Sequence, residues 1–163
     1  MKEIPLTKGA AALIDDEDYE LVRRYKWQLL DHGKRQYATT TYSVKNRTKH
    51  IYMHRLIMGF PKGKEVDHIN FDGLDNRRLN LRSCSKSQNH FNLRKRKSAS
   101  RFKGVVLVPS TGKWHARIKI DGKTKHLGTY SSEEDAALAY DNMALQIAGE
   151  FALLNFPSMK AAM

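Results

Sequence analysis

The sequence predicts an α+β fold built from two small domains. Strand patterns fill residues 1–53, a strand–loop–strand–helix order spans 49–94, and three strands followed by one helix occupy 101–157. A chain of 163 residues is long enough for two such domains. Residues 95–100 begin with three bases and continue with small residues, so we expect a basic linker between domains 1–94 and 101–157.

Short alternating segments and polar turns define the first region. We expect strands over 2–6, 10–14, 26–30 and 36–42, and a short helix over 18–25 capped by Asp15 or Asp16. Turn residues at 31–33 and 45–47 separate strands that then run antiparallel.

The middle region alternates strands with polar loops. We expect strands over 49–52, 65–69 and 80–82, a short helix over 53–58 that ends at Gly59, and a loop over 70–76. Ser85 to Gln88 has the spacing of a capping box and opens a further helix. The order after residue 65 is therefore strand, loop, strand, helix.

The third region contains the clearest strand pattern. From Lys113 to Ile120 basic and apolar side chains alternate, which places them on opposite faces of a strand. Asp121-Gly122 predicts a two-residue hairpin turn, and 123–130 returns as the next strand. Ser131 or Ser132 then caps a helix that ends at Gly149. We expect a three-stranded antiparallel sheet packed on one helix.

The charge distribution favours a nucleic-acid partner. The formal net charge is +12 and the pI is about 9.9. Residues 1–20 hold six acids and two bases, whereas the stretch from Arg82 to Tyr130 holds thirteen Lys or Arg and one acid. Concentrated positive charge binds a polyanion through counterion release. The alternative is that this charge only keeps the protein soluble.

Several classes are excluded by composition. No apolar run approaches the ~20 residues that span a bilayer, and the N-terminus has no apolar signal core. Cys84 is the only cysteine, so neither an intramolecular disulfide nor a zinc site built on Cys pairs is expected. We expect a cytoplasmic protein of a bacterial host or a phage-infected cell, without membrane contact, structural zinc or a small-molecule cofactor.

Four segments of the middle region form one recognisable string. They are Met53–Gly59, Val66–Asn70, Leu74–Arg82 and Gln88–His90. This string resembles the HNH endonuclease family, and most of all its phage and intron-encoded homing branch, in which the last motif position is Asn. The resemblance implies a ββα-metal nuclease core over about 49–94 that the N-terminal strands lead into.

The resemblance also implies roles for individual residues. His68 is the expected general base that activates water, and Asn80 is expected to hold the ring of His68 and to brace the loop. Asp67 and Asn89 are the expected ligands of Mg²⁺ or Mn²⁺, with the neighbouring His90 as an alternative to Asn89. Asp67 and His68 point to opposite faces of a strand unless the strand ends there.

The third region resembles the plant apetala-two, or ethylene-response-factor, DNA-binding domain. The matching segments are Phe102–Val105, Lys113–Ile118, Leu127–Tyr130, Glu133–Asp141 and Leu154–Pro157. The resemblance implies a sheet that lies in the major groove of duplex DNA. The sequence departs from the plant pattern at 106–108, which are apolar rather than basic, and at His126, which replaces a tryptophan. The plant target sequence therefore does not transfer.

The resemblances and the charge together predict a metal-dependent DNA endonuclease of the homing type, which nicks or cuts double-stranded DNA. The alternatives are a non-catalytic DNA-binding regulator with a decayed nuclease domain and, less favoured, a ribonuclease. The residues expected to contact DNA are Arg77, Arg78, Arg82, Arg94, Lys95, Arg96, Lys97, Lys103, Lys113, His115, Arg117, Lys119 and Lys125.

Overall fold

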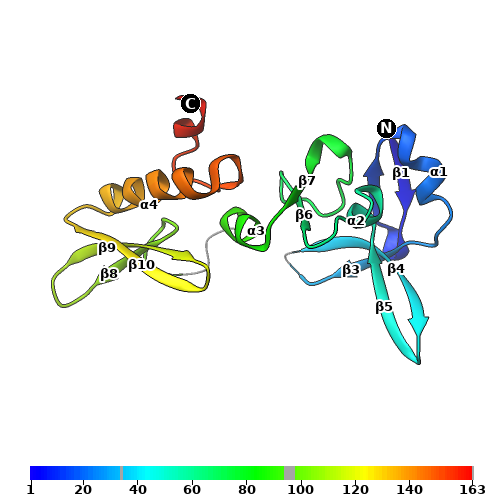
Figure 1. Cartoon of the computed structure of the whole chain (residues 1–163), viewed down its shortest axis with the longest axis horizontal. Helices are drawn as coiled ribbons and strands as arrows, with labels where there is room; N and C mark the ends of the chain where they lie inside the picture. The colour runs from blue at the N-terminus through cyan, green and yellow to red at the C-terminus, as the bar shows by residue number, and fades with distance from the viewer. Residues whose placement is uncertain (34, 94–97, 163) are drawn as a thin grey trace. The chain divides into compact units, whose positions relative to one another are not determined.

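The chain divides into two compact units, Met1–Ser85 and Lys86–Met163, which are described separately below. The computed structural model describes residues 1–33, 35–93 and 98–162 and has the mixed α and β content that the sequence predicts (Figure 1). Three of the six residues of the expected linker, Lys95 to Lys97, lie outside the described residues. The expected boundary after residue 94 therefore stays a prediction. No helix among the described residues is long and apolar enough to cross a membrane.

The first unit contains three small antiparallel sheets. Strand β1 (Lys2–Pro5) pairs with β2 (Ala11–Ile14), β4 (Gln36–Val44) lies between β3 (Gln28–Asp31) and β5 (Arg47–Tyr52), and β6 (Glu65–His68) pairs with β7 (Leu81–Cys84). Lys45 and Asn46 have φ of 48° and 60°, as a two-residue hairpin turn between β4 and β5 requires. The β4–β5 hairpin extends beyond the remainder of this unit (Figure 1).

Short helices complete the core of the first unit. They are α1 (Tyr19–Val22), α2 (Met53–Ile57) and three 3₁₀ turns, Thr7–Gly9, Asp16–Asp18 and Arg78–Asn80. Helix α1 is shorter than the expected 18–25, because the indole of buried Trp27 donates a hydrogen bond of 2.9 Å to the Val22 carbonyl and draws the chain back. Buried side chains of β1, β2, α1, α2, β6 and β7 form one continuous apolar cluster.

Backbone hydrogen bonds attach the β6–β7 loop to the N-terminal hairpin. The Leu13 amide donates to the Leu74 carbonyl and the Asn76 amide donates to the Leu13 carbonyl, both at 2.8 Å. These bonds form a parallel bridge between Leu13 and Asp75. The loop expected over 70–76 is thus held at one end beside β2, in the position that a third strand of the β1–β2 sheet would take.

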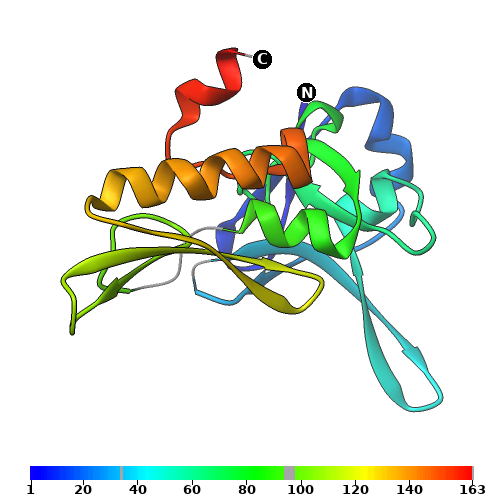
Figure 2. The ribbon, with the colours of Figure 1, turned by 60° about the vertical axis from the view of Figure 1, so that its left-hand side comes forward.

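The second unit is a three-stranded antiparallel sheet with one long helix on one face (Figure 2). It contains α3 (Lys86–Asn92), β8 (Val105–Val108), β9 (Lys113–Ile120), β10 (Lys123–Tyr130) and α4 (Glu133–Ala148), followed by 3₁₀ turns at Gly149–Phe151 and Pro157–Ala162. The Ser132 hydroxyl accepts the Asp135 amide at 3.0 Å, which caps α4 as one of the two expected caps. Strands β6, β7 and helix α3 follow in ββα order, but α3 belongs to this unit, so the ββα-metal arrangement stays a prediction.

Strand β9 has the register that the alternation predicts. Ala116 and Ile118 are buried against α4, while Arg117 and Lys119 are exposed on the other face. In β8, Val105 pairs with Ala116 and faces α4, and Val106 beside it is exposed. The face of the sheet away from α4, called the outer face below, therefore carries the basic side chains of β9.

We expect Ile118→Ala and Arg117→Ala to have opposite effects on stability. Ile118 is 2% exposed, so its truncation leaves a cavity against α4 and costs roughly 2–5 kcal/mol of unfolding free energy. Arg117→Ala is expected to cost under ~0.5 kcal/mol because the side chain is exposed. Thermal or urea melts of both variants measure this, and a large loss for Arg117→Ala alone would show that the β9 register is off by one.

Candidate active site

His68 lies at the last position of β6, where the strand ends and the polar loop begins. Its side chain is buried, with 6% of its surface exposed. The ring Nε2 lies 3.4 Å from Oδ1 of Asn76, which is itself fully buried. Strand β6 ends at His68, one residue earlier than the expected strand over 65–69, so Asp67 and His68 are the last two residues of the strand.

The hydrogen bonds of Asn76 determine the tautomer of His68. The Asn76 Nδ2 donates to the Leu74 carbonyl at 3.0 Å, which leaves Oδ1 facing the ring. Because an amide oxygen can only accept, Nε2 of His68 carries the proton. The lone pair of the neutral ring is therefore on Nδ1, the nitrogen that is able to accept a proton.

A second imidazole, that of His54, and the phenol ring of Tyr37 lie beside His68, and the phenol ring of Tyr52 lies beside His54. The ring of His54, from α2, meets the ring of His68 edge to face at 4.7 Å. Tyr37 of β4 lies 6.1 Å from His68 and 5.8 Å from His54, and Tyr52 lies 5.4 Å from His54. A Cβ on Gly73 would lie 2.6 Å from the Tyr37 ring, so the loop approaches this cluster as closely as only glycine permits.

Burial keeps both imidazoles uncharged. Burial, with smaller contributions from the nearby His68 and Arg55, lowers the pKa of His54 to about 3. Burial also lowers the pKa of His68, while the hydrogen bond with Asn76 and the charge of Asp67 act in the opposite direction. The Nδ1 atom of His54 is buried and has no hydrogen-bond partner within the described structure. At neutral pH His68 is therefore a neutral base beside a second neutral ring.

Asn80 braces the loop that follows His68. Its Nδ2 donates to the Asp75 carbonyl at 2.7 Å, and its Oδ1 accepts the Asn70 amide at 3.0 Å. Asn70 in turn donates to the Asp75 carboxylate at 3.0 Å. Asn80 thus bonds to two backbone groups of this loop, and Asn76 lies against the ring of His68. The role expected of Asn80 in the reaction stays a prediction.

Asp67 forms an ion pair across the β6–β7 ladder. Its Oδ2 accepts from Nε and Nη2 of Arg82 at 3.2 and 3.1 Å, and both side chains are nearly buried. Asp67 offers the carboxylate oxygen that a hard divalent cation prefers. Across residues 1–33, 35–93 and 98–162 no three His, Cys, Asp or Glu side chains cluster as a metal site. Mg²⁺ typically takes only one or two protein oxygens, so a single carboxylate suits it.

Asn89 and His90, the expected second ligand and its alternative, lie on α3 in the second unit. The C-terminal end of α3 is fixed within that unit, because Phe91 is buried in its apolar cluster and the Phe91 carbonyl accepts the Leu153 amide. The assignment of Asn89 or His90 as a ligand beside Asp67 stays a prediction.

The arginines expected to touch phosphate in the first unit pair with carboxylates. Arg77 forms two hydrogen bonds of 2.7 Å with Asp75, and Arg78 binds Asp18 at 2.6 Å and Glu17 at 2.8 Å. Together with the Arg82–Asp67 pair, these contacts show that the three side chains order the unit. The clustered acids near the N-terminus serve as partners for Arg78. Phosphate contact by these arginines stays a prediction.

The outer face of the second unit collects several of the predicted DNA-contacting residues. Lys113, His115, Arg117 and Lys119 alternate along β9, and His126 of β10 pairs directly opposite Arg117. The rings of His115 and His126 meet at 4.6 Å, and Nη2 of Arg117 lies 3.2 Å from Nδ1 of His115. This face is basic with histidine rings at its centre.

Two other predicted contacts lie elsewhere. Lys125 pairs with Ile118, so the ladder places it on the α4 side of the sheet and not with Arg117. The ammonium of Lys103 donates to the Phe91 carbonyl at 2.6 Å, and burial lowers the pKa of Lys103 to about 8. Lys103 therefore supports the interior of its unit. The predicted contacts Arg94, Lys95, Arg96 and Lys97 lie outside the described residues.

Sequence reasoning missed Asn76 and Tyr37 as neighbours of His68. Asn76 lies inside the recognised string and precedes two arginines, a setting that suggested only a turn residue. Tyr37 is 31 positions before His68 and gave no local signal, since a tyrosine in a strand is ordinary core or surface. The residue pattern of β4 predicts a strand but does not indicate which loop packs against that strand.

Comparison with known proteins gives matches of two kinds. A family model described as HNH endonuclease matches residues 47–91, which include His54, His68 and Asn76. An uncharacterized HNH endonuclease of Acanthamoeba polyphaga mimivirus is 33% identical over 150 residues, which are 91% of this chain and 76% of that protein.

The second kind of match is to plant proteins and is partial. An AP2-like ethylene-responsive transcription factor of Arabidopsis thaliana is 37% identical over 83 residues, 47% of this chain and 24% of that protein. An AP2/ERF and B3 domain-containing protein of Oryza sativa subsp. japonica is 45% identical over 64 residues, 39% of this chain and 17% of that protein. The chain thus spans at most about a quarter of these two relatives.

We expect the stability of the first unit to fall as the pH falls from 7 to 5. The pKa of His54 is about 3 when folded and about 6.5 when unfolded, so the unfolded chain binds more protons below pH 6.5. Stability is therefore full above pH 6.5 and is lost on acidification, by about 2 kcal/mol between pH 7 and 5. Urea melts should show that His54→Gln flattens this slope. An unchanged slope would show that His54 is accessible to protons in the folded state.

Proposed function

Because this chain belongs to the HNH endonuclease family, we propose that it is a metal-dependent DNA endonuclease of the homing type that hydrolyses a phosphodiester bond with a water activated by His68. The observation that carries this proposal is the neutral, hydrogen-bonded His68 at the end of β6, inside the matched residues 47–91. A base of this kind beside the scissile phosphate accelerates hydrolysis by taking the proton of the attacking water.

Different residues of the first unit accept the proton and orient the base in the proposed reaction. Nδ1 of His68 accepts the proton of the attacking water, while the hydrogen bond from Nε2 to Asn76 keeps the ring in this tautomer. The new P–O bond forms as the bond to the leaving oxygen of the DNA strand breaks. His54 and Tyr37 limit the ring to one orientation and restrict access of bulk water to it.

A divalent cation is part of the proposal. Asp67, with Asn89 or His90, would hold Mg²⁺ or Mn²⁺ through oxygen or imidazole donors. When bound, such a cation stabilises the negative charge that develops on the phosphate and the leaving oxygen. The ion pair between Asp67 and Arg82 holds the Asp67 carboxylate in one position until a cation competes for it.

The second unit is proposed to grip duplex DNA through its outer face. The partial matches to plant AP2-type transcription factors support a DNA-binding module, and the basic side chains of β9 give the face the right charge. A sheet of this kind is able to enter the major groove, where Arg117 would meet a guanine edge or a phosphate. His126, which stands where the plant pattern has a tryptophan, pairs with Arg117, so this face differs in composition from that of the plant domains.

We expect purified protein to convert supercoiled plasmid to open-circular or linear DNA with Mg²⁺ and not with chelator. His68→Ala should reduce the rate at least ~10²-fold and leave DNA binding in chelator unchanged, because the general base is lost but no phosphate contact is. His32→Ala, an exposed histidine in the β3–β4 turn, is the matched control and should cut normally. If wild type leaves every plasmid intact with all common divalent metals yet binds DNA, the chain is a regulator with a decayed nuclease.

We expect Arg117→Ala to weaken duplex binding while the domain stays folded. The loss should be roughly 1–3 kcal/mol with relaxed sequence preference if Arg117 reads a base, or uniform with a salt slope lower by about one if it touches phosphate. Lys123→Ala removes the same charge from the α4 side of the sheet, where Lys123 pairs with Ile120. Salt-titrated fluorescence anisotropy compares the two variants, and equal losses would place the DNA contact away from the outer face.

A further inference from the structure

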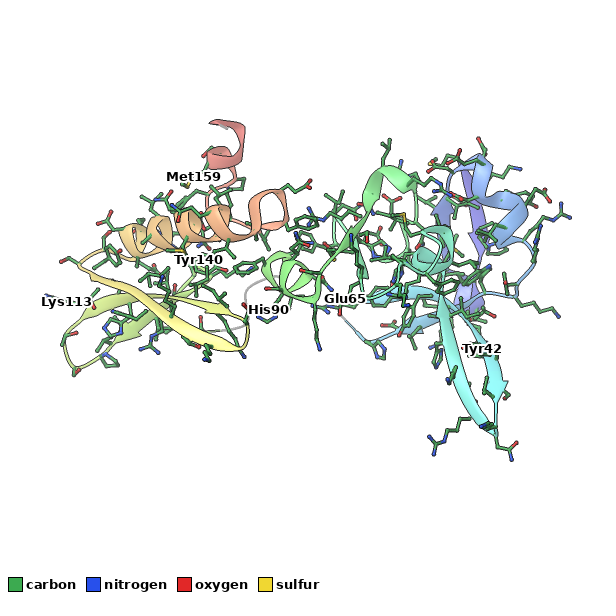
Figure 3. The ribbon with its side chains drawn as sticks, in the orientation of Figure 1. Tyr42, Glu65, His90, Lys113, Tyr140 and Met159 are labelled. Carbon is green, nitrogen blue, oxygen red and sulfur yellow. The ribbon has the colours of Figure 1, made fainter. Side chains whose placement is uncertain are left out.

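The outer half of the β4–β5 hairpin is a free-standing β-ribbon. This segment, residues 41–50, is called the arm. All ten of its side chains are exposed, on both faces and at both edges. Figure 3 shows labelled Tyr42 on this hairpin, where it extends beyond the remainder of the first unit. An isolated two-stranded ribbon buries almost nothing, so its own packing does not explain its length.

The arm lies in a stretch of the chain without acidic residues. From His32 to Lys64 there are eight Lys or Arg and no Asp or Glu. Three of these bases, Lys45, Arg47 and Lys49, are on the arm itself. The bases near the β6–β7 loop, in contrast, are paired with carboxylates, as Arg77 is with Asp75. The arm therefore presents positive charge that no acid of its own segment neutralises.

The pairing of β4 with β5 sorts the arm into two faces. Tyr42 pairs with Lys49 and Val44 with Arg47, so one face combines two bases with a tyrosine and a valine. On the other face Thr41 pairs with His50 and Ser43 with Thr48, so this face consists of hydroxyl groups and one imidazole. Neither face has the continuous apolar surface of a protein interface.

We infer that the arm binds the backbone of the duplex DNA substrate, with Arg47 and Lys49 on phosphates and Lys45 reaching a further phosphate from the tip. This inference rests on the proposed nuclease function and adds a contact site outside the outer face of the second unit. A two-stranded ribbon fits the major groove, which is about 12 Å wide. Four residues per strand at about 3.3 Å each give the arm a reach of roughly 13 Å, enough to cross that width.

The arm is continuous in the chain with the candidate active site. It continues directly into Tyr52 and α2, where the ring of Tyr52 contacts His54 and the ring of His54 contacts His68. A phosphate backbone held by Arg47 and Lys49 is therefore aligned by the same strand that ends at the candidate active site. Binding of this kind is shared by ground state and transition state, so its loss raises KM and leaves kcat nearly unchanged.

The test is the triple variant Lys45→Gln, Arg47→Gln and Lys49→Gln in the full chain. Binding to a mixed-sequence duplex is measured by anisotropy in chelator across a salt series, together with cleavage of plasmid in Mg²⁺. Loss of three phosphate contacts should lower the slope of log affinity against log salt by about 2–3 and weaken binding at least tenfold at low salt. The matched control removes three exposed charges from other segments of the same unit, Lys8→Gln, Arg24→Gln and Lys26→Gln, and should change the slope by less than one.

The outcomes separate the arm from the nuclease proposal. A lower slope in the arm variant only, with raised KM and retained kcat, supports the inference. If the arm variant keeps the wild-type slope while the wild type cuts DNA, the inference about the arm is overturned and the proposed function stays intact. Equal loss in the control overturns it as well, because the effect is then net charge. A loss seen with an RNA duplex of the same sequence and not with DNA would also overturn it. Failure of the wild type to bind or cut any DNA would instead remove the proposed function.

Discussion

Asn76 is the residue on which the candidate active site depends. Its backbone amide is bound to the Leu13 carbonyl, its side-chain nitrogen to the Leu74 carbonyl, and its side-chain oxygen faces the ring of His68. Each of these groups would be costly to bury without a partner. Because all three belong to one residue, a shift of Asn76 would disturb the three bonds at once. Through this one buried amide, the N-terminal hairpin determines which nitrogen of His68 is basic.

The charges of the first unit are organised around the same loop. Arg77 and Arg78 are used to bind Asp75, Asp18 and Glu17, and Asn80 and Asn70 complete the network. The acidic segment near the N-terminus thereby becomes part of the structure and does not remain a free negative surface. The β4–β5 hairpin, in contrast, carries basic side chains and has no acidic residue near it in the sequence. In the second unit, the basic side chains of β9 are exposed. The distribution of paired and unpaired charge, more than the net charge of +12, indicates where a polyanion can bind.

Local rules predicted much of the fold. Strand β9 has the bounds expected from alternation, the Asp121-Gly122 turn has positive φ at both residues, and Ser132 caps α4. These features depend on neighbours in sequence, where period and turn chemistry are strong guides. His68 was also recognisable, because its segment carries the family string. Helix α1 was overestimated because the Trp27 indole, a contact beyond its own pattern, ends it early.

The contacts around His68 were beyond such rules because they join residues far apart in the chain. Tyr37 reaches the ring from β4, and the bonds from Leu13 and Asp18 reach the loop across about sixty positions. Closing loops of that length costs conformational entropy, and the residue pattern near His68 does not reveal which distant segment will offset that cost. The matched family segment begins at residue 47, yet the loop beside His68 is held by hydrogen bonds to residues 13 to 18. A gene fragment trimmed to the family boundary would therefore encode the chemical groups of a nuclease without the strand that gives them their arrangement.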